Sequence, residues 1–597
     1  MLNLPKDNFV FLETNRFDRD NHRSFLFCNP IRVISCYKPD RIKDSFLELE
    51  DFVSRGFHAA GFISYEAGYV FEDSFKGYKD AGSNFPLIWF GIYKDPVTLR
   101  HREKIDIFRH KDMPYSIEDL RANISRSRYV YNIKRIKDLI RRGDTYQVNY
   151  TFKYRFGFCG SPFSFYEDLK AKQSVSYSAF IKTPEHSILS LSPELFFRKD
   201  KHHMEVRPMK GTIDRGRDSE EDRRNMKTLE ESLKNRSENV MIVDLLRNDL
   251  GRVSRSGSVK TKKLFTVEQY ETLLQMISIV KSSLKKEVAL YDLFKAIFPS
   301  GSVTGAPKIN TMKIINSLEK RPRHIYTGGI GFFAPKGKAV FNVAIRTVLI
   351  DHKTKKGEMG VGSGIVYDSD PYKEFEECKL KANFITQKRK FFGLIETILW
   401  RPGKGYFLLR HHLGRLALSA RYFDFKFDKK LIIRKLKSLE RSFENDSDYK
   451  VRLLLHKDGR LESDFTTLDK KMRSAKVRFS DKRTSSRDMF LYHKTTNRNL
   501  YDQEYEKWQK KGYFDIIFTN EKDQVTEGAI SNIIIKKNRS YYTPPLECGL
   551  LNGVFRRHLL EKRTFPIREK ILYIGDIRKA DEIYMINSVR GMVKVAL

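Results

Sequence analysis

A polar, basic segment at residues 386–393, TQKRKFFG, divides this sequence into two parts. Before it, an expected helix ends in EECKLKA, and after it a new strand begins in LIETILW. The chain has 597 residues, several times the roughly 100–200 residues of a common domain, so two or more hydrophobic cores are expected. We therefore predict two domains, residues 1–390 and 391–597, and we find no internal repeat.

The first part alternates short apolar runs with turn residues, a pattern typical of strands in an antiparallel sheet. Helical stretches are expected from Ser127 to Arg142 and in SENVMIVDLLRNDLG, where Glu238 opens the helix. The predicted fold class is α+β, a large domain of antiparallel sheet and helices followed by a smaller α+β domain. The expected strands are PIRVISCY, AAGFISYEAGYVF, FPLIWFGIY, YQVNYTFKYRF, YSAFIKT, HSILSLSPELFFRKD, HMEVRPMKGTI, IYTGGIGFFAP, KAVFNVAIRTVLI and KGEMGVGSGIVYD.

The net charge is +37, from 112 Lys and Arg against 75 Asp and Glu. Such a balance favours nucleic-acid binding when the charge is gathered in one arm or recognition helix. Here basic clusters such as NIKRIKDLIRR and KTKKGE are scattered along the chain and mixed with acids. We therefore predict no nucleic-acid partner and a charged surface that attracts anionic substrates. Salt-dependent duplex binding, unaffected by substrate, would support the alternative of a basic nucleic-acid-binding module.

The cysteines and the apolar segments bear on the compartment. Cys28, Cys36, Cys159, Cys378 and Cys548 form no CxxC pair, so a reducing compartment fits. The first residues, MLNLPKDNFVF, lack the basic-then-apolar layout of a secretory signal, and no apolar run approaches the roughly 20 residues of a membrane span. We predict a cytoplasmic protein with no membrane partner.

Eight motifs follow one another in the first part. They are DTYQVNY, LSPELFF, RPMKGT, ENVMIVDLLRNDLG, FPSGSVTGAPK, YTGGIGFF, FNVAIRT and GVGSGIVYDSDPYKEFEE. Their order and approximate spacing resemble the chorismate-utilising family, which includes anthranilate, isochorismate, salicylate and aminodeoxychorismate synthases. The resemblance covers most of residues 25–385 and implies chorismate as the substrate.

Three acidic residues are candidate magnesium ligands. Glu374 and Glu377 lie three residues apart and so share one helical face, and Glu238 belongs to another helix. Taken alone, each would be an ordinary solvated acid, but carboxylate oxygens are the ligands that Mg²⁺ prefers. The resemblance implies that Glu238 and Glu377 bind the metal directly and Glu374 through water. The ion would hold the ring carboxylate of chorismate.

The resemblance also implies which residues bind the rest of chorismate. Arg346, in AIRT, matches the arginine that grips the enolpyruvyl carboxylate in a bidentate fork. Tyr326 and the backbone amides of Gly362, Ser363 and Gly364 are expected to assist, because glycines let the chain approach a ligand closely. Without the motif, these glycines would be read as a simple strand turn.

Thr304, in FPSGSVTGAPK, and Gln147, in DTYQVNY, complete the predicted substrate-binding set. Gln147 lies where salicylate-forming relatives carry a lysine that acts as a base on water. Glutamine cannot act as that base, so attack by water at ring C2 is disfavoured. Gln275 lies where several relatives carry a histidine, which argues against a lyase reaction in this domain.

Lys210, in RPMKGT, selects among the reactions of the family. It occupies a position where anthranilate and salicylate synthases carry alanine and aminodeoxychorismate synthases carry lysine. The resemblance implies that its amine attacks ring C2 and expels the C4 hydroxyl, and that ammonia then enters at C4 and displaces the lysine. Burial favours the neutral, nucleophilic amine by lowering its pKa. Glu194, in LSPEL, is the matching general acid for the departing hydroxyl.

The second part contains another ordered set of motifs. They are LIETI, RHHLGRLALSARYFDF, HKTTNR, TEGAISNIII, YYTPPLECGLLNGVFRR and INSVRG. Together they resemble the fold-type IV pyridoxal-phosphate family, which includes branched-chain and D-amino-acid aminotransferases and aminodeoxychorismate lyase. The resemblance covers nearly all of residues 391–597 and implies pyridoxal 5′-phosphate as a cofactor.

Lys494 matches the Schiff-base lysine of this family, which also moves a proton between cofactor and substrate carbons. Glu527 is expected to face the pyridine nitrogen and keep it protonated. The remaining predicted cofactor-binding groups hold the phosphate, two of them at an expected helix start where free N–H groups collect. They are Arg415, Ser588 and the backbone amides of Val554 and Phe555.

The substrate of the second part stays open between two reactions. Aminotransferases and lyases of this family share the cofactor residues, and Arg452 and Arg590 can be read either as carboxylate anchors or as surface arginines. Fusion to a lysine-bearing chorismate domain favours the lyase, which would release pyruvate from 4-amino-4-deoxychorismate and give p-aminobenzoate for folate. The alternatives are a fused aminotransferase and, for the first part, an anthranilate synthase component, which an ortho product would identify.

Two partners are expected. No cysteine lies in the nucleophile-elbow context of a glutamine amidotransferase, so ammonia is predicted to come from a separate glutaminase subunit or from solution. Relatives of the second part are commonly dimers, and the resemblance therefore implies a homodimer through the C-terminal domain.

Overall fold

The computed structural model describes residues 7–16, 20–75, 84–100, 113–270, 273–386, 392–444, 446–468, 475–562 and 566–597. The chain forms two compact units. Residues 1–213 and 227–389 make the first, and residues 214–226 and 390–597 make the second. The boundary predicted near residue 390 falls outside the described residues. The sequence did not predict that residues 214–226 belong to the second unit.

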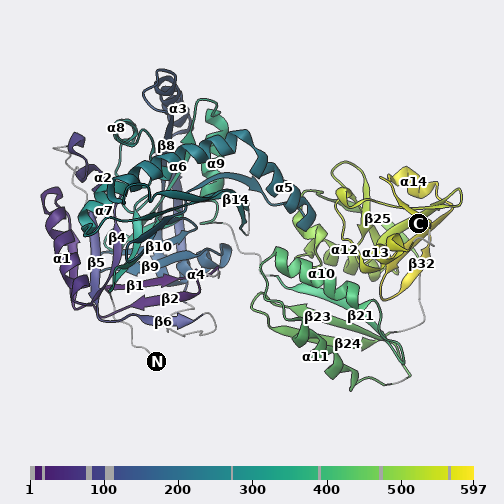
Figure 1. Ribbon diagram of the computed structural model, residues 1–597. Coiled ribbons are helices and arrows are strands. Elements are labelled where there is room, and N and C mark those ends of the chain that lie inside the picture. Colours follow the sequence, from purple (N-terminus) through teal and green to yellow (C-terminus); the bar gives the residue numbers. More distant parts are fainter. Residues whose placement is uncertain are drawn as a thin grey trace. The chain divides into compact units, whose positions relative to one another are not determined.

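The first unit contains two large sheets (Figure 1). In the first sheet, neighbouring strands are antiparallel in the order β16 (Gly305–Ala306), β8 (Gln147–Gly160), β20 (Lys356–Ile365), β19 (Thr347–Asp351), β10 (His186–Ser192), β9 (Tyr177–Lys182), β1 (Phe9–Glu13), β2 (Arg23–Phe27) and β6 (Val97–Arg100), with β7 (Tyr115–Ala122) also paired to β8. In the second, the order is β13 (Met209–Asp214), β15 (Leu273–Ser283), β12 (His203–Val206), β11 (Leu195–Asp200), β18 (Lys338–Val343), β17 (Gly329–Ala334), β4 (His58–Ile63), β5 (Ile88–Tyr93) and β3 (Arg32–Cys36), with β14 (Lys260–Gln269) also paired to β15.

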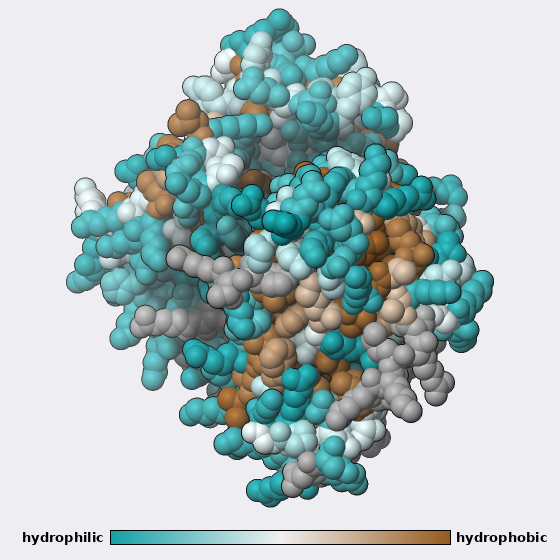
Figure 2. All heavy atoms as spheres, turned by 90° about the vertical axis from the view of Figure 1, so that its right-hand side faces the viewer, coloured by the Kyte–Doolittle hydropathy of each residue, from teal (hydrophilic) through white to brown (hydrophobic). Residues whose placement is uncertain are grey.

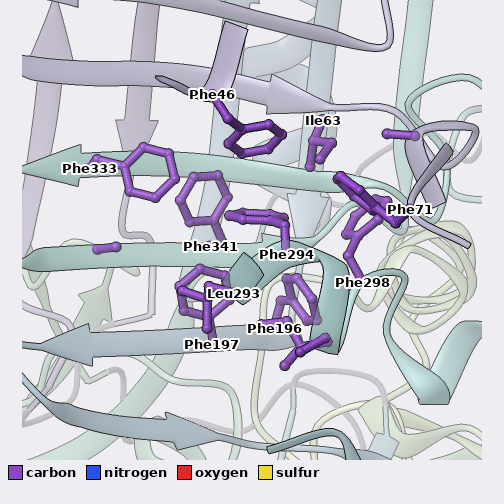
Figure 3. Packing of buried hydrophobic residues seen from close by; sticks show 14 of the residues in the cluster. Phe46, Ile63, Phe71, Phe196, Phe197, Leu293, Phe294, Phe298, Phe333 and Phe341 are labelled. Atoms are coloured by element: carbon purple, nitrogen blue, oxygen red, sulfur yellow. The ribbon is translucent and has the colours of Figure 1, made fainter. Parts of the chain in front are cut away.

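The buried residues arrange this unit in four layers. One cluster, which includes Val10, Phe62 and Leu349, lies between the two sheets. A second joins α1 (Ile42–Ser54), α6 (Leu233–Val253) and α7 (Leu290–Ile297) to the second sheet, and Figure 3 shows its phenylalanines in contact. A third joins α3 (Arg126–Arg141), α4 (Pro162–Lys172), α8 (Lys308–Leu318) and α9 (Pro371–Ala382) to the first sheet. Because β8 lies between a helical layer and the other sheet, it is buried on both faces from Gln147 to Lys153. The α+β prediction is confirmed.

Two local predictions were wrong. The run AAGFISYEAGYVF is a strand only to Ile63, after which it forms α2 (Ala67–Val70). The chain turns there because the Glu66 carboxylate accepts hydrogen bonds from the backbone amides of Arg323 and His324. Helix α6 begins at Leu233 and not near Glu238, because the Ser232 side chain caps it by accepting from the Asn235 amide. Glu238 therefore lies in the second turn.

The second unit contains three smaller sheets. Their strand orders are β22 (Gly405–Tyr406), β21 (Leu394–Arg401), β23 (Tyr449–Leu455), β24 (Leu461–Thr467); β25 (Val477–Thr484), β26 (Asp515–Asn520), β27 (Val525–Gly528); and β30 (Ile567–Glu569), β29 (Ser540–Thr543), β28 (Asn532–Lys537), β31 (Glu582–Asn587), β32 (Gly591–Val595). The helices are α10 (Leu409–Tyr422), α11 (Lys429–Glu440), α12 (Asn499–Gln509), α13 (Val554–Glu561), α14 (Ile574–Arg578) and most of α5 (Ser219–Glu231).

The surface agrees with the charged composition. Figure 2 shows a face covered largely by hydrophilic side chains and interrupted by hydrophobic areas, the largest of them towards its centre and right. Among the described residues, no helix combines the length and hydrophobicity that a membrane crossing requires.

Candidate active sites

Lys210 lies on β13 at the edge of the second sheet, next to strands of the first. A Cβ atom added to Gly364 of β20 would lie 3.1 Å from Lys210 Nζ and 2.5 Å from Gln147 Nε2. The register places Gln147 and Gly364 on one face of the first sheet, since Gly364 pairs with Asn149, two residues along β8 from Gln147. Three predicted site residues, Lys210, Gln147 and Gly364, therefore meet at one place.

The Lys210 amine is half-buried and lies among carboxylates. Burial lowers its pKa, and the neighbouring Lys381 acts in the same direction. Glu238, Glu194 and Glu377 oppose this shift by favouring the charged amine. The amine is thus desolvated and surrounded by three of the acids that the motifs identified.

Glu194 is buried directly before β11. Ser302 Oγ donates a hydrogen bond of 2.6 Å to Glu194 Oε1. Burial raises the pKa of Glu194 to about 7, against the opposing effects of Ser302 and Lys210. A carboxyl that keeps its proton near neutral pH can act as a general acid.

The three predicted magnesium ligands come from α6 and α9. Burial raises the pKa of Glu238, Lys210 and Lys234 oppose the shift, and Glu374 and Glu377 add to it by like-charge repulsion. Glu374 Oε1 accepts from Ser369 Oγ at 2.8 Å, and within the described ranges no three metal-ligating side chains converge on a single point. The donor set is nevertheless all carboxylate, and a divalent cation with several waters would relieve the repulsion, so the residues fit Mg²⁺.

Lys381 is a component of this site that the sequence analysis missed. Its Nζ lies 2.7 Å from Glu377 Oε1 and donates to the carbonyl oxygen of Gly362 at 3.0 Å. It follows Glu377 by four residues on α9, and this i,i+4 spacing is the signal that could have identified it. Ser302, in FPSGSVTGAPK, was also missed.

Two other predicted substrate-binding residues, Arg346 and Thr304, make contacts that do not involve Lys210. Arg346 adopts a left-handed backbone conformation with φ of 51°, and its Nη1 donates to Gln173 Oε1 at 3.1 Å. Burial lowers the pKa of Arg346. Thr304 Oγ1 donates to the Ser300 carbonyl at 3.0 Å. Within the described part of the chain, neither Arg346 nor Thr304 forms a hydrogen bond or ion pair with Lys210.

Strand β20 shows which groups face the site. The Ser363 hydroxyl bonds to Tyr129 in the core at 3.1 Å, so only its backbone is available to a ligand. Gly360 packs against the ring of Tyr326, where a side chain at position 360 would collide with it. Gln147 Oε1 is buried without a hydrogen-bond partner among the described residues.

In the second unit, Lys494 follows η4 (Met489–Tyr492) and lies in a desolvated environment near two arginines and two carboxylates. Burial, Arg498 and Arg415 lower the pKa of Lys494 to about 7, against the opposing effects of Glu396 and Glu527. A substantial fraction of the amine is therefore neutral at neutral pH, the form that attacks a carbonyl carbon.

Glu527, at the end of β27, is buried and held by three donors. Glu527 Oε1 accepts from Tyr501 and from the Leu551 amide, and Glu527 Oε2 accepts from Asn532. Burial raises the pKa of Glu527 to about 8. A fixed carboxyl beside the Lys494 amine fits the ring nitrogen and aldehyde of pyridoxal phosphate.

The predicted phosphate-binding groups are less uniform. Arg415 of α10 holds the buried Glu396 in a bidentate ion pair at 2.7 and 2.9 Å. Val554 and Phe555 begin α13 after Gly553, where any side chain would collide with Asn532. These two amides lie at a helix start, as predicted.

Three further residues lie near strand ends or on the surface. Ser588 Oγ donates a long 3.5 Å hydrogen bond to the Thr397 carbonyl. Arg452 forms a 3.6 Å ion pair with Asp464 on the surface of β23 and β24, and Arg590 is exposed. These contacts agree with the surface interpretation of both arginines. Arg498 was missed by the sequence analysis, although it ends the motif HKTTNR.

Comparisons with known proteins match two successive parts of the chain. Residues 9–387 match the family model described as chorismate binding enzyme, and residues 393–597 match the model described as amino-transferase class IV.

Among curated relatives, aminodeoxychorismate synthase component 1 of Salmonella typhimurium is 37% identical over 266 residues, which cover 44% of this chain and 58% of that protein. Anthranilate synthase component 1 of Methanothermobacter marburgensis is 32% identical over 371 residues, which cover 59% of this chain and 80% of that protein. Among solved structures, anthranilate synthase component I of Streptococcus pneumoniae has a TM-score of 0.54 and 25% identity, covering 65% of this chain and 94% of the other.

Proposed function

This chain belongs to the chorismate binding enzyme family and carries an amino-transferase class IV domain, and on that basis we propose that it makes p-aminobenzoate in two steps. The first unit aminates chorismate to 4-amino-4-deoxychorismate, and the second removes pyruvate from that intermediate. Relatives include both aminodeoxychorismate and anthranilate synthases, so sequence similarity alone does not choose the first product. The desolvated Lys210 amine beside the protonatable Glu194 carries the proposal.

The amination is a double displacement. Lys210 Nζ forms a bond to ring C2 while the C4 hydroxyl leaves as water with a proton from Glu194. Ammonia then forms a bond to C4, the bond between C2 and Lys210 breaks, and the nitrogen is left para to the ring carboxylate. The sum is chorismate and ammonia in, aminated product and water out. Glu238 and Glu377, with Glu374 through water, would hold a Mg²⁺ ion that neutralises the ring carboxylate.

In the second unit, Lys494, Glu527, Arg415, Ser588 and the amides that begin α13 would hold pyridoxal phosphate. When bound, this cofactor accepts the electrons released at the reacting carbon. The neutral Lys494 amine can take the proton that leaves ring C4 and return a proton to the methylene carbon of the departing enolpyruvate. Loss of the C4 proton and the C3–O bond leaves an aromatic ring and pyruvate.

Two partners belong to the proposal. A separate glutamine amidotransferase would supply ammonia, because the similar relative is named component 1 of aminodeoxychorismate synthase, a name that implies a second component. A homodimer through the C-terminal domain is proposed from the resemblance of that domain to its family.

Product identification tests the function. The purified chain, with chorismate, Mg²⁺, an ammonium salt and pyridoxal phosphate, is expected to form p-aminobenzoate and one pyruvate per turnover, whereas glutamine without the partner subunit should not replace ammonium. An ortho product would establish an anthranilate synthase component. Amino transfer to a keto acid without pyruvate release would establish the fused aminotransferase, which the class IV family model also covers.

The pKa of Glu194 predicts a pH profile for amination. Because the general acid must carry a proton and its pKa is about 7, kcat/KM for chorismate should fall as pH rises through that value. Glu194→Gln should lower the rate by roughly 10²–10⁴-fold and remove this alkaline limb.

Ser302→Ala is the matched control for this profile. The Ser302 hydrogen bond lowers the pKa of Glu194, so its removal should shift the limb to higher pH while the acid remains. An alkaline limb that stays unchanged in both variants would assign it to another group.

A further inference from the structure

The second unit includes a short segment from the middle of the first unit's sequence. Residues 214–226, the linking segment, begin at the end of β13, four residues after Lys210, and continue into α5. They form a compact unit with residues 390–597. The segment contributes buried charged groups to that unit, and so it is more than a surface loop.

Arg215 anchors the linking segment. Its guanidinium forms a bidentate ion pair with Asp222, with distances of 2.6 to 3.0 Å, and both side chains are buried. The same guanidinium lies 4.1 Å from the ring centroid of Tyr422 and donates to its carbonyl at 3.2 Å. The Tyr422 hydroxyl donates in return to the Gly216 carbonyl at 2.6 Å. The last residue of α10 is thus held on its ring, its carbonyl and its hydroxyl.

Tyr422 in turn packs against His493, the residue before Lys494. Its ring centroid lies 4.4 Å from that of His493. His493 is buried and bonded to Ser419 at 2.9 Å. Burial lowers the pKa of His493 to about 4, so the ring is neutral and packs as an uncharged group.

Arg217 makes a second contact on the same stretch. Its Nη1 donates to the Tyr492 hydroxyl at 3.0 Å, and that hydroxyl donates to the Ser486 carbonyl at 2.9 Å. The two residues before Lys494 are therefore both supported by the linking segment. From the other side, the Ile395 amide donates to the Lys494 carbonyl at 2.8 Å.

We propose that the linking segment is a positioning element for Lys494, with Arg215 and Arg217 fixing the Tyr492–His493 backbone from which the lysine side chain extends. This inference rests on the proposed role of Lys494 in holding pyridoxal phosphate. A side chain held from both sides keeps its amine in a desolvated position, and loss of one support admits water to it.

The hydration of Lys494 offers a readout that a purely structural role would not change. Four groups act on this amine besides burial, namely Arg498, Arg415, Glu396 and Glu527, and none of them belongs to the linking segment. If the Tyr492–His493 backbone loosens, burial weakens and the pKa of Lys494 moves up from about 7 towards its ordinary value. Attachment of pyridoxal phosphate, which needs the neutral amine, should then require a higher pH.

The test uses the full chain and two variants of different severity. Arg215→Lys keeps the charge but loses the bidentate fork and the contact with the ring. Tyr422→Phe removes only the hydroxyl bond to Gly216 and keeps the ring on His493. The control is Arg223→Ala, because Arg223 is exposed on the same helix.

Three measurements report on cofactor binding, on the protonation of the Lys494 amine and on the stability of the backbone next to it. They are the affinity for the cofactor by absorbance titration, the pH midpoint of its borohydride-reducible attachment to Lys494, and amide hydrogen exchange of residues 486–496 without cofactor. For Arg215→Lys we expect affinity to fall about tenfold, the midpoint to rise by about one pH unit, and exchange to accelerate. Tyr422→Phe should change each in the same direction by less, and Arg223→Ala should match the wild type.

The outcomes separate the inference from the proposed function. If the wild type attaches the cofactor at Lys494 and both variants retain its affinity and midpoint, the inference is wrong, even where they melt at a lower temperature. If the wild type attaches no cofactor at Lys494, the function proposed for the second unit fails. In that case the positioning role is judged by amide hydrogen exchange alone. If the exchange of residues 486–496 is unchanged in both variants, the positioning role is also wrong.

Discussion

Lys210→Ala is expected to reduce amination of chorismate at least about a thousandfold, which corresponds to ~4 kcal/mol of activation free energy at 1.36 kcal/mol per factor of ten. Alanine has no amine to attack ring C2, and the other side chain next to Gly364 is the amide of Gln147, which is not a nucleophile. The measurement is the initial rate of 4-amino-4-deoxychorismate formation with saturating ammonium and Mg²⁺.

The same variant carries its own control. Lys210→Ala should still convert added 4-amino-4-deoxychorismate to p-aminobenzoate, because that reaction belongs to the second unit. Lys338→Ala, a change of an exposed lysine in the first unit, should leave amination unaltered. Substantial amination by Lys210→Ala would show that ammonia attacks without a covalent lysine intermediate.

Lys494→Ala is expected to stop the pathway at the aminated intermediate. Pyruvate release should fall by roughly 10²–10⁴-fold or more, the range lost with a positioned proton-transfer group, while amination of chorismate continues. Chromatography should therefore show accumulation of 4-amino-4-deoxychorismate from the intact chain.

Lys482→Ala, which alters an exposed lysine of β25, is the matched control and should release pyruvate normally. Undiminished p-aminobenzoate formation by Lys494→Ala would exclude this lysine as the catalytic base.

The sequence predicted those strands and helices whose formation depends on the local pattern of apolar residues. Alternating apolar runs identified most strands of the second sheet and half of those of the first, because each of these strands buries side chains that its own sequence supplies. The pattern did not identify α2, whose turn depends on a hydrogen bond that the Glu66 carboxylate accepts from the amide of Arg323, far away in sequence. It also placed the start of α6 too late, since the capping Ser232 stands outside the apolar period.

The candidate site was predictable to a similar degree. The family motifs named Lys210, Gln147 and Gly364, which come from three strands and meet in the structure. They did not name Lys381 or Ser302, whose roles arise from contacts with Glu377 and Glu194. Local spacing could have revealed Lys381, but Ser302 reaches Glu194 only through the fold.

The linking segment could not have been predicted at all. Its sequence, DRGRDSEEDRRNM, has the composition of a solvated helix. Its burial depends on Tyr422 and His493, more than 200 residues away. No pattern within the segment itself indicates those partners.

Because residues 214–226 belong to the second unit, the two units cannot be produced separately by a simple truncation. A truncation that keeps only residues 392–597 would omit Arg215 and Asp222 and uncover the ring of Tyr422. Conversely, an N-terminal fragment would carry a helix whose buried ion pair has lost its surroundings. The two units are therefore not separable by one cut, and gene fission at the junction would yield a C-terminal unit lacking an internal part.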